Sequence, residues 1–217
     1  MTIKISVKRK SAETGNMGNS GQRKVFSEEQ IRLIKQYLYC RDNLKSVRDL
    51  ALFSFALDTM LRSIDLLKLK VSDVIDKDGN LLEHIEIKQQ KTGKSTLVEI
   101  TKTTAKSLAR WIEESEKCYE DFIWTGFTHN KKKSLSISRA AYGNIIKGWV
   151  NDILGIDASD YNTHSLRRTK ASMIYEKTQN IEVVRQLLGH SSVAATSAYL
   201  NIGKKDALRV AREVLSI

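Results

Sequence analysis

Residues 163–169 read Thr-His-Ser-Leu-Arg-Arg-Thr, and this stretch decides how the rest of the chain is interpreted. In a helix, His164 and Arg167 are three residues apart and lie on one face. Arg168, four residues from His164, would serve as well by geometry. A His-x-x-Arg pair also arises by chance. Whether it is functional therefore depends on which other ionisable residues the chain contains.

Four other ionisable side chains each have an ordinary structural explanation when taken alone. Arg62 lies where a buried helix is expected to meet a short one, and it could pair with the carboxylate three residues on. Lys91 lies in a polar hairpin turn, where a lysine is usually solvated. His190 is expected at a helix end, where it could act as a cap. Tyr199 has the spacing of a core residue.

Taken in order along the chain, these residues resemble the motif series of the tyrosine recombinase (phage integrase) family. The matching segments are Leu61-Arg62-Ser63-Ile64-Asp65-Leu66-Leu67, Lys91-Thr92-Gly93-Lys94, residues 163–169, Leu187-Leu188-Gly189-His190-Ser191-Ser192 and Thr196-Ser197-Ala198-Tyr199. The resemblance covers roughly residues 26–203 and favours Arg167 over Arg168. It implies an α+β, mainly helical catalytic domain with a small antiparallel three-stranded sheet, and a site-specific recombinase that acts on double-stranded DNA.

The resemblance also implies a reaction path without metal or cofactor, through a covalent 3′-phosphotyrosine intermediate. Tyr199 would be the nucleophile. Arg62 and Arg167 would bind the non-bridging phosphate oxygens, because planar guanidinium forks fit those oxygens and stay charged. Lys91 would be the general acid that protonates the leaving 5′ oxygen.

Two histidines and a carboxylate complete the implied site. His164 would assist proton removal or hold the phosphate, and His190 would donate a hydrogen bond to a phosphate oxygen. Asp65 would orient a cation or a histidine rather than take part in the chemistry. Lys94 could contact a base edge or a phosphate. The sequence has no histidine or cysteine spacing typical of a metal site, and no glycine-rich phosphate loop.

The net charge agrees with a nucleic-acid partner. The chain has 36 basic residues against 25 acidic ones, which gives a net charge of +11. Such a surplus favours a polyanion, with nucleic acid first and an acidic membrane second. We assign Lys131, Lys132, Lys133 and Arg168 to DNA phosphates. Residues 1–25 are predicted as a flexible basic arm, which either adds phosphate contacts through residues 4–10 or is an unstructured terminus without a role.

Other features of the 217 residues exclude several classes of protein. No apolar run reaches about 18 residues, so no membrane-spanning segment is expected. The N-terminus lacks the long apolar core of a signal peptide. Cys40 and Cys118 cannot make a disulfide framework and are typical of a reducing cytosol. We therefore expect a cytoplasmic protein of bacterial, phage or mobile-element origin.

Apolar periodicity predicts several helices and one hairpin in a catalytic domain over residues 26–217. Ser27 begins a helix with a capping box, and Phe26 and Ile31 are placed as its hydrophobic staple. Further helices are expected over roughly 46–61, after a cap at Ser63, after Thr101, after a cap at Ser138, and through the last third. Residues 85–100 are predicted as a β-hairpin and residues 122–124 as a further short strand.

The chain departs from the family pattern in two places. Asn162 stands where many members have a proline, which should not alter the chemistry. Larger members carry a separate DNA-clamping domain, whereas 25 residues precede the catalytic domain here. The chain fits either a minimal one-domain recombinase or one from which the clamp has been removed. The amphipathic tail at 204–217 either packs on its own core or, as the resemblance implies, docks on a neighbour in a tetramer that holds two DNA sites.

Three other functions compete with recombination. A type IB topoisomerase-like enzyme would use the same residues to relax DNA without exchanging partners. A basic DNA-binding regulator could keep the scaffold without catalysis, although the complete residue set argues against it. A membrane-surface protein would explain the charge but not the order of the motifs.

Overall fold

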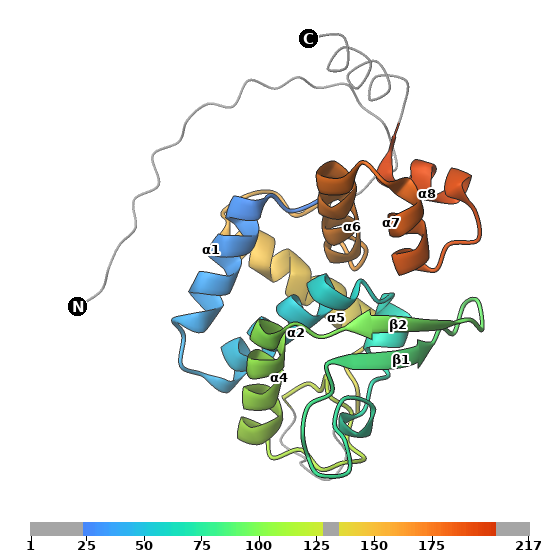
Figure 1. Ribbon diagram of the computed structural model, residues 1–217. Helices are drawn as coiled ribbons and strands as arrows, with labels where there is room; N and C mark the ends of the chain where they lie inside the picture. The colour runs from blue at the N-terminus through green and yellow to red at the C-terminus, as the bar shows by residue number, and fades with distance from the viewer. Residues whose placement is uncertain (1–23, 128–134, 203–217) are drawn as a thin grey trace.

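The computed structural model describes residues 24–127 and 135–202 (Figure 1). The predicted basic arm up to Arg23, the three lysines at 131–133 and the tail from Lys204 lie outside the described residues, so what was expected of them stays a prediction. The helices and strands follow in the order α1 (Glu28–Tyr39), α2 (Leu44–Thr59), α3 (Ser63–Leu66), η1 (Val71–Asp73), β1 (His84–Lys88), β2 (Ser95–Glu99), α4 (Lys102–Glu114), α5 (Arg139–Gly148), η3 (Trp149–Ile153), α6 (Ser165–Thr178), α7 (Ile181–Leu188) and α8 (Val193–Leu200).

Helix α1 begins where the sequence predicts. The Ser27 hydroxyl accepts a hydrogen bond from the Gln30 backbone at 3.2 Å, and the Gln30 side chain accepts one from the Ser27 backbone at 3.0 Å, which confirms the capping box. Phe26 is buried, and its backbone N–H donates to the Thr169 hydroxyl at 2.8 Å. Its ring lies 4.8 Å from that of Tyr161. These contacts fasten the start of α1 to α6.

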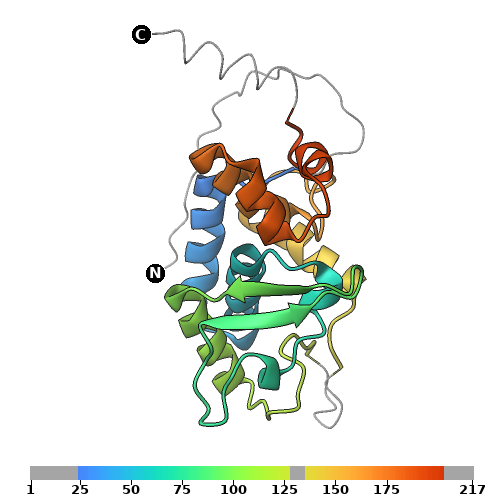
Figure 2. The same ribbon diagram turned by 45° about the vertical axis from the view of Figure 1, so that its right-hand side comes forward.

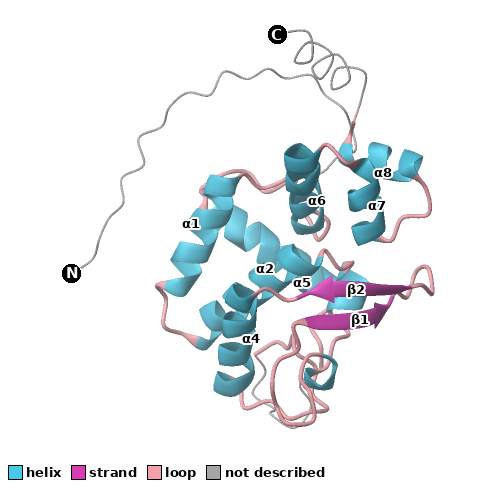
Figure 3. Ribbon diagram, viewed as in Figure 1, coloured by secondary structure: helices cyan, strands magenta, loops and turns pink. Residues whose placement is uncertain are grey.

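Helix α2 lies at the centre of the fold and packs against α1, α4 and α6 (Figures 1 and 3). Two aromatic side chains on it are fully buried. Phe53 meets Trp149 of η3 edge to face at 5.2 Å, and Phe55 meets Trp124 at 5.6 Å. One helix therefore joins the π-helical turn η3 and the 122–124 segment into a single core. The helix ends at Thr59 because Met60 adopts a left-handed conformation with φ of 50°.

A buried ion pair ties α2 to two distant segments. Arg48 and Asp49 are neighbours in the chain, and their side chains are joined at 2.7 Å with about 5% of each exposed. The second carboxylate oxygen of Asp49 accepts from the Trp149 indole N–H at 3.2 Å, and Arg48 donates to the Thr125 carbonyl at 3.3 Å. Since every strong polar group has a partner, the pair fixes where η3 and the segment near Thr125 lie against α2.

The sheet has two antiparallel strands, β1 and β2, among the described residues, rather than the three predicted. Ile85 pairs with Val98, and both face the core. The expected third strand does not form, because the backbone groups of residues 122–124 make hydrogen bonds to two different neighbouring segments. The Ile123 N–H donates to Leu69, and the Trp124 carbonyl accepts from Ile137, one isolated contact on each side. A ladder needs several consecutive pairs along one neighbour. In Figure 2 the hairpin crosses the middle of the molecule.

Helices α6, α7 and α8 pack over a small second core on one side of the hairpin (Figure 2). Its fully buried apolar side chains are Met60, Ala171, Val184 and Leu188, and the partly buried ring of Tyr199 packs against them. Gly189 ends α7 with φ of 64°, as predicted from its place after two leucines. In the part of the chain that the structure describes, each helix is too short or too polar to cross a bilayer.

Candidate active site

The junction after α2 and the hairpin turn form one wall of the site. Arg62, rather than the predicted Ser63, occupies the cap position of α3, because its extended backbone precedes the first helical residue. Its guanidinium donates to the side-chain oxygen of Gln89 at 2.5 Å, and this amide, not Asp65, is its hydrogen-bond partner. Arg62 lines an open cavity of about 670 Å³ together with Lys91 and His164. The structure thus brings together residues that are about a hundred positions apart in the chain.

Arg167 lies deeper, on the first turn of α6, with 4% of its surface exposed. Two of its guanidinium nitrogens donate to main-chain carbonyls, one to Met60 and one to Leu188, the latter at 2.7 Å. Burial lowers the pKa of Arg167 to about 10, which leaves it charged at neutral pH. Because both partners are neutral carbonyls, they orient the guanidinium without cancelling its charge.

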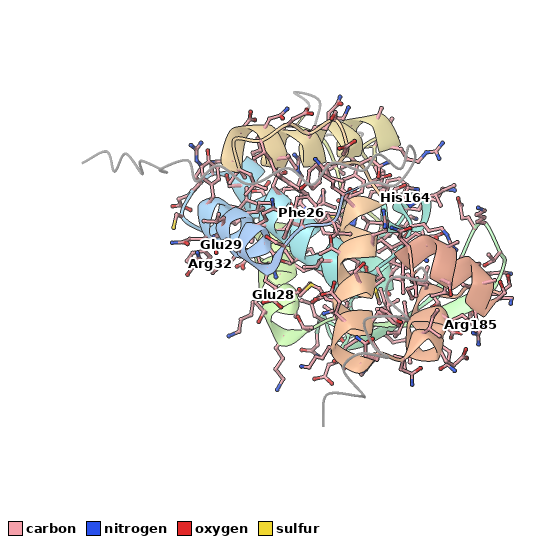
Figure 4. The ribbon with its side chains drawn as sticks, turned by 90° about the horizontal axis from the view of Figure 1, so that it is seen from above. Phe26, Glu28, Glu29, Arg32, His164 and Arg185 are labelled. Atoms are coloured by element: carbon pink, nitrogen blue, oxygen red, sulfur yellow. The ribbon has the colours of Figure 1, made fainter. Side chains whose placement is uncertain are left out.

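Both histidines face the same group of cations. The pKa of His164 is lowered by desolvation and then by the charges of Arg167, Arg62 and Lys91. The same causes, in the same order, lower the pKa of His190 to about 4. Figure 4 shows His164 at the N-terminal end of α6. Both imidazoles are therefore neutral at neutral pH, and a neutral imidazole can accept a proton.

The His190 ring is held by two neighbours from α8. Its Nδ1 lies 3.1 Å from the Thr196 hydroxyl, which is fully buried. The ring also meets that of Tyr199 edge to face at 5.3 Å. The turn before it is secured by Arg185 of α7, labelled in Figure 4, which donates to the His190 carbonyl at 2.7 Å. His190 and Tyr199 are therefore placed as one unit.

The Tyr199 hydroxyl is buried beside the small core. Burial raises the pKa of Tyr199, whereas the charges of Arg167, Arg168 and Arg62 lower it. Arg167 acts on the hydroxyl through its charge and as a hydrogen-bond donor, whereas Arg168 and Arg62 act through their charge. Arg168 also lies 5.9 Å from the centre of the Tyr199 ring. It therefore contacts the tyrosine, whereas the sequence assigned it to DNA.

Asp65 holds the hairpin turn. One carboxylate oxygen accepts from the backbone N–H of Gln90 at 2.9 Å, next to Lys91 in the chain. The other is buried without a hydrogen-bond partner among the described residues. The sequence predicted that Asp65 orients a cation or a histidine. Its carboxylate orients the segment that carries the cation Lys91, and its charge acts on Arg167 from a distance, while its role in the reaction stays a prediction.

The remaining predicted DNA contacts are only partly placed. Lys91 and Lys94 are exposed in the hairpin turn. Sequence reasoning missed Arg139, an exposed residue that opens α5 and lines the same cavity as Arg62. A signal was present, because a basic residue in the first turn of a helix is unfavourable next to the helix dipole. It also missed Gln89 and Thr196, whose roles depend on contacts that no local pattern predicts.

Comparisons with known proteins identify the family of the chain. The model of the phage integrase family matches residues 24–205. A probable integrase/recombinase, YoeC, of Bacillus subtilis is 28% identical over 190 residues, 88% of this chain and 94% of its own length. A tyrosine recombinase of Pseudothermotoga lettingae is 28% identical over 160 residues, 74% of this chain and 51% of its own length. The chain thus spans nearly all of the first relative and about half of the second.

Solved structures show the same fold. The XerA recombinase superposes with a TM-score of 0.68 at 20% identity, over 93% of this chain and 66% of that one. The post-cleavage complex of XerH recombinase with its difH substrate superposes with a TM-score of 0.67 at 19% identity, over 88% of this chain and 53% of that one. The family match and the fold together define the catalytic domain of a tyrosine recombinase. The chain belongs to the phage integrase family, and it is accordingly a DNA breaking-and-rejoining enzyme of the kind that carries out site-specific recombination.

Proposed function

We propose that the protein recombines DNA at specific sites by cleaving and rejoining strands through a covalent 3′-phosphotyrosine at Tyr199. One observation carries the proposal. Arg62, Lys91 and Arg167 act together on both histidines, and none of the three has a salt bridge among the described residues. Clustered cations without a salt-bridge partner repel one another, so the site is built to receive an anion. A DNA phosphodiester is the anion that the family's chemistry supplies.

The proposed first step is an in-line attack by the Tyr199 oxygen on the scissile phosphorus. A bond forms between that oxygen and phosphorus, and the bond from phosphorus to the 5′ oxygen breaks. The tyrosine proton passes to neutral His164, and Lys91 gives a proton to the departing 5′ oxygen. Arg62, Arg167 and His190 hold the non-bridging oxygens, where negative charge builds up.

The proposed second step reverses the first with a different strand. A 5′ hydroxyl from the partner duplex attacks the phosphorus and gives its proton to Lys91, which the first step left neutral. The bond between phosphorus and the Tyr199 oxygen breaks, and that oxygen takes up the proton held by His164. The phosphoester bond is conserved in the protein adduct, so rejoining needs no other energy source. We further propose that four molecules assemble on two DNA sites, because strand exchange needs two duplexes held together. The amphipathic tail at 204–217 would make the contacts between neighbours.

A nicked duplex tests the chemistry. Duplexes that bind the protein are selected from a random pool, and one strand is nicked beside the cleavage position so that the short 5′-hydroxyl fragment diffuses away. The wild-type protein should form an adduct that survives denaturant, and the Tyr199→Phe variant should form none. An adduct with the Phe variant would show that another residue is the nucleophile.

Arg167→Lys tests the phosphate-binding assignment in the same assay. It keeps the charge but loses the planar fork that donates to two carbonyls at once. Adduct formation should fall by about 100-fold or more, the usual effect of removing one oriented donor. A rate close to wild type would transfer the role to Arg168.

Two sites on separate DNA molecules distinguish recombination from relaxation. Recombinant products are expected. If supercoils are relaxed while no partners are exchanged, the protein is a type IB topoisomerase-like enzyme instead.

A further inference from the structure

Gln89 is a buried polar side chain at the point where three parts of the site meet. It directly follows β1, and 2% of its surface is exposed. Its amide oxygen accepts from Arg62 at 2.5 Å and from the Thr92 hydroxyl at 3.0 Å. On its other side it lies against Gly189, where an added Cβ would come within 2.6 Å of the Gln89 amide nitrogen.

Each of these contacts belongs to a segment that carries a proposed catalytic residue. Arg62 itself is one of them. Thr92 follows Lys91 in the hairpin turn, and the turn is closed around Gln89 by backbone hydrogen bonds from Gln89 to Lys94 and from Gly93 to Gln89, at 2.9 and 2.8 Å. Gly189 precedes His190. One side chain thus sets the distance between the hairpin turn, the start of α3 and the end of α7.

We propose that Gln89 is a positioning residue for the strand-cleavage reaction, which fixes the Arg62 guanidinium against the hairpin turn without neutralising it. This inference rests on the proposed function. A neutral amide suits the task better than a carboxylate. A carboxylate at this place would form a stronger, charge-assisted pair with Arg62 and would compete with the DNA phosphate for it. An apolar side chain would leave the guanidinium without a buried acceptor.

Gly189 belongs to the same arrangement. Its positive φ disfavours any side chain with a Cβ, and the close approach of Gln89 leaves no space for one. Because Gly189 has no side chain, the Gln89 amide packs directly against its backbone, and the end of α7 can lie next to the hairpin.

The test compares Gln89→Met and Gln89→Glu with wild type on the nicked duplex. Gln89→Met removes the acceptor, and Gln89→Glu keeps an acceptor of the same shape but adds a charge. Gln89→Met should bind DNA as wild type does and Gln89→Glu more weakly, while at saturating DNA the rate of adduct formation falls by about 100-fold in both, the scale expected for a misplaced catalytic group. Thermal unfolding of each variant shows that it is folded.

The matched controls are Gln36→Met and Gln36→Glu. Gln36 also accepts from an arginine, Arg32, at 3.5 Å, but on the exposed face of α1. These variants should keep the wild-type rate of adduct formation.

A second substrate separates positioning from a general structural effect. A methylphosphonate at the cleavage position removes the negative charge that Arg62 would stabilise. On that substrate the difference between Gln89→Met and wild type should shrink to within a few fold.

An equal loss on both substrates would overturn the positioning role. A wild-type rate for Gln89→Glu on the phosphate would overturn the need for a neutral amide. Adducts at the wild-type rate in both Gln89 variants would overturn the inference while leaving the proposed function standing.

Discussion

At the scale of single residues, the site consists of charges that are oriented by neutral groups. Arg167 is held by two carbonyls and Arg62 by an amide. His190 is held by a hydroxyl, that of Thr196. Each of these neutral partners fixes a donor while leaving its charge or proton available to a ligand. This arrangement gives preorganisation, because the donors do not have to reorient when a phosphate arrives.

Thr196 should determine which nitrogen of His190 carries the proton. Its single hydroxyl proton can go to the Ser192 carbonyl at 3.3 Å or to His190 Nδ1 at 3.1 Å. If it goes to Nδ1, the neutral ring carries its own proton on Nε2 and can donate to a phosphate oxygen. Thr196→Val should therefore slow adduct formation by about five- to tenfold, since one hydrogen bond of roughly 1–1.5 kcal/mol is lost.

Thr196→Ser is the control for that change, because it restores the hydroxyl and should restore the rate measured with the nicked duplex. If Val and Ser variants are equally active, the hydroxyl has no part in placing the histidine.

The charge of His190 should depend on bound phosphate. Its pKa is lowered to about 4 in the free protein by desolvation and by three cations. A bound phosphodiester supplies negative charge next to the ring, so the pKa should rise when DNA binds. A titration of the imidazole by NMR, with and without a short duplex, measures both values. A midpoint that does not move would place the phosphate away from His190.

The same shift predicts how stability depends on pH. A histidine whose pKa is lowered by folding binds a proton more readily in the unfolded chain. The stability that it contributes is present above its unfolded pKa and is lost as the pH falls toward 4. The free energy of unfolding should therefore fall between about pH 6.5 and pH 4. His190→Gln should reduce this dependence, as measured by urea unfolding at a series of pH values.

At the scale of elements, the sequence predicted correctly those helix ends that depend on hydrogen bonds between nearby residues. Ser27, Ser138 and Gly189 cap their helices where the sequence places them, because each cap depends on residues within four positions. The prediction of a third strand was wrong, because an apolar run does not show which neighbouring segment its backbone groups will form hydrogen bonds with. Gln89 was missed because its partners lie 27 and 100 residues away. The six proposed catalytic residues could be found only as an ordered motif series.

The first turn of α5 should contact DNA. Arg139 is exposed there and lines the cavity with Arg62 and Lys91. Arg139→Gln should weaken DNA binding at low salt and reduce the slope of log affinity against log salt by about 1, as expected when one phosphate contact is lost. Arg110→Gln is a suitable control, because Arg110 on α4 is already paired with Asp42 and Glu114. Equal slopes for wild type and Arg139→Gln would exclude the contact.

At the scale of the whole molecule, the main core depends on a buried ion pair that connects distant segments. Asp49→Ala leaves the Arg48 charge buried without its partner and should lower the free energy of unfolding by about 3–5 kcal/mol. By contrast, Glu29→Ala breaks an ion pair in which 63% of the Arg32 side chain and 70% of the Glu29 side chain are exposed. This change should lower the free energy of unfolding by at most about 1 kcal/mol. Urea denaturation of both variants makes the comparison, and similar losses would contradict it.

The described residues form a large core and a small one, and this difference should affect how fast each part of the fold opens. The small core under α6, α7 and α8 has four fully buried apolar side chains, and Tyr199 packs against it. Segments with few buried contacts open locally at a lower free energy than the whole domain. Amide hydrogens of α7 and α8 should therefore exchange with solvent much sooner than those of α2. The proposed nucleophile thus lies in the part of the fold that should open first, so its exposure should not require the rest of the protein to unfold.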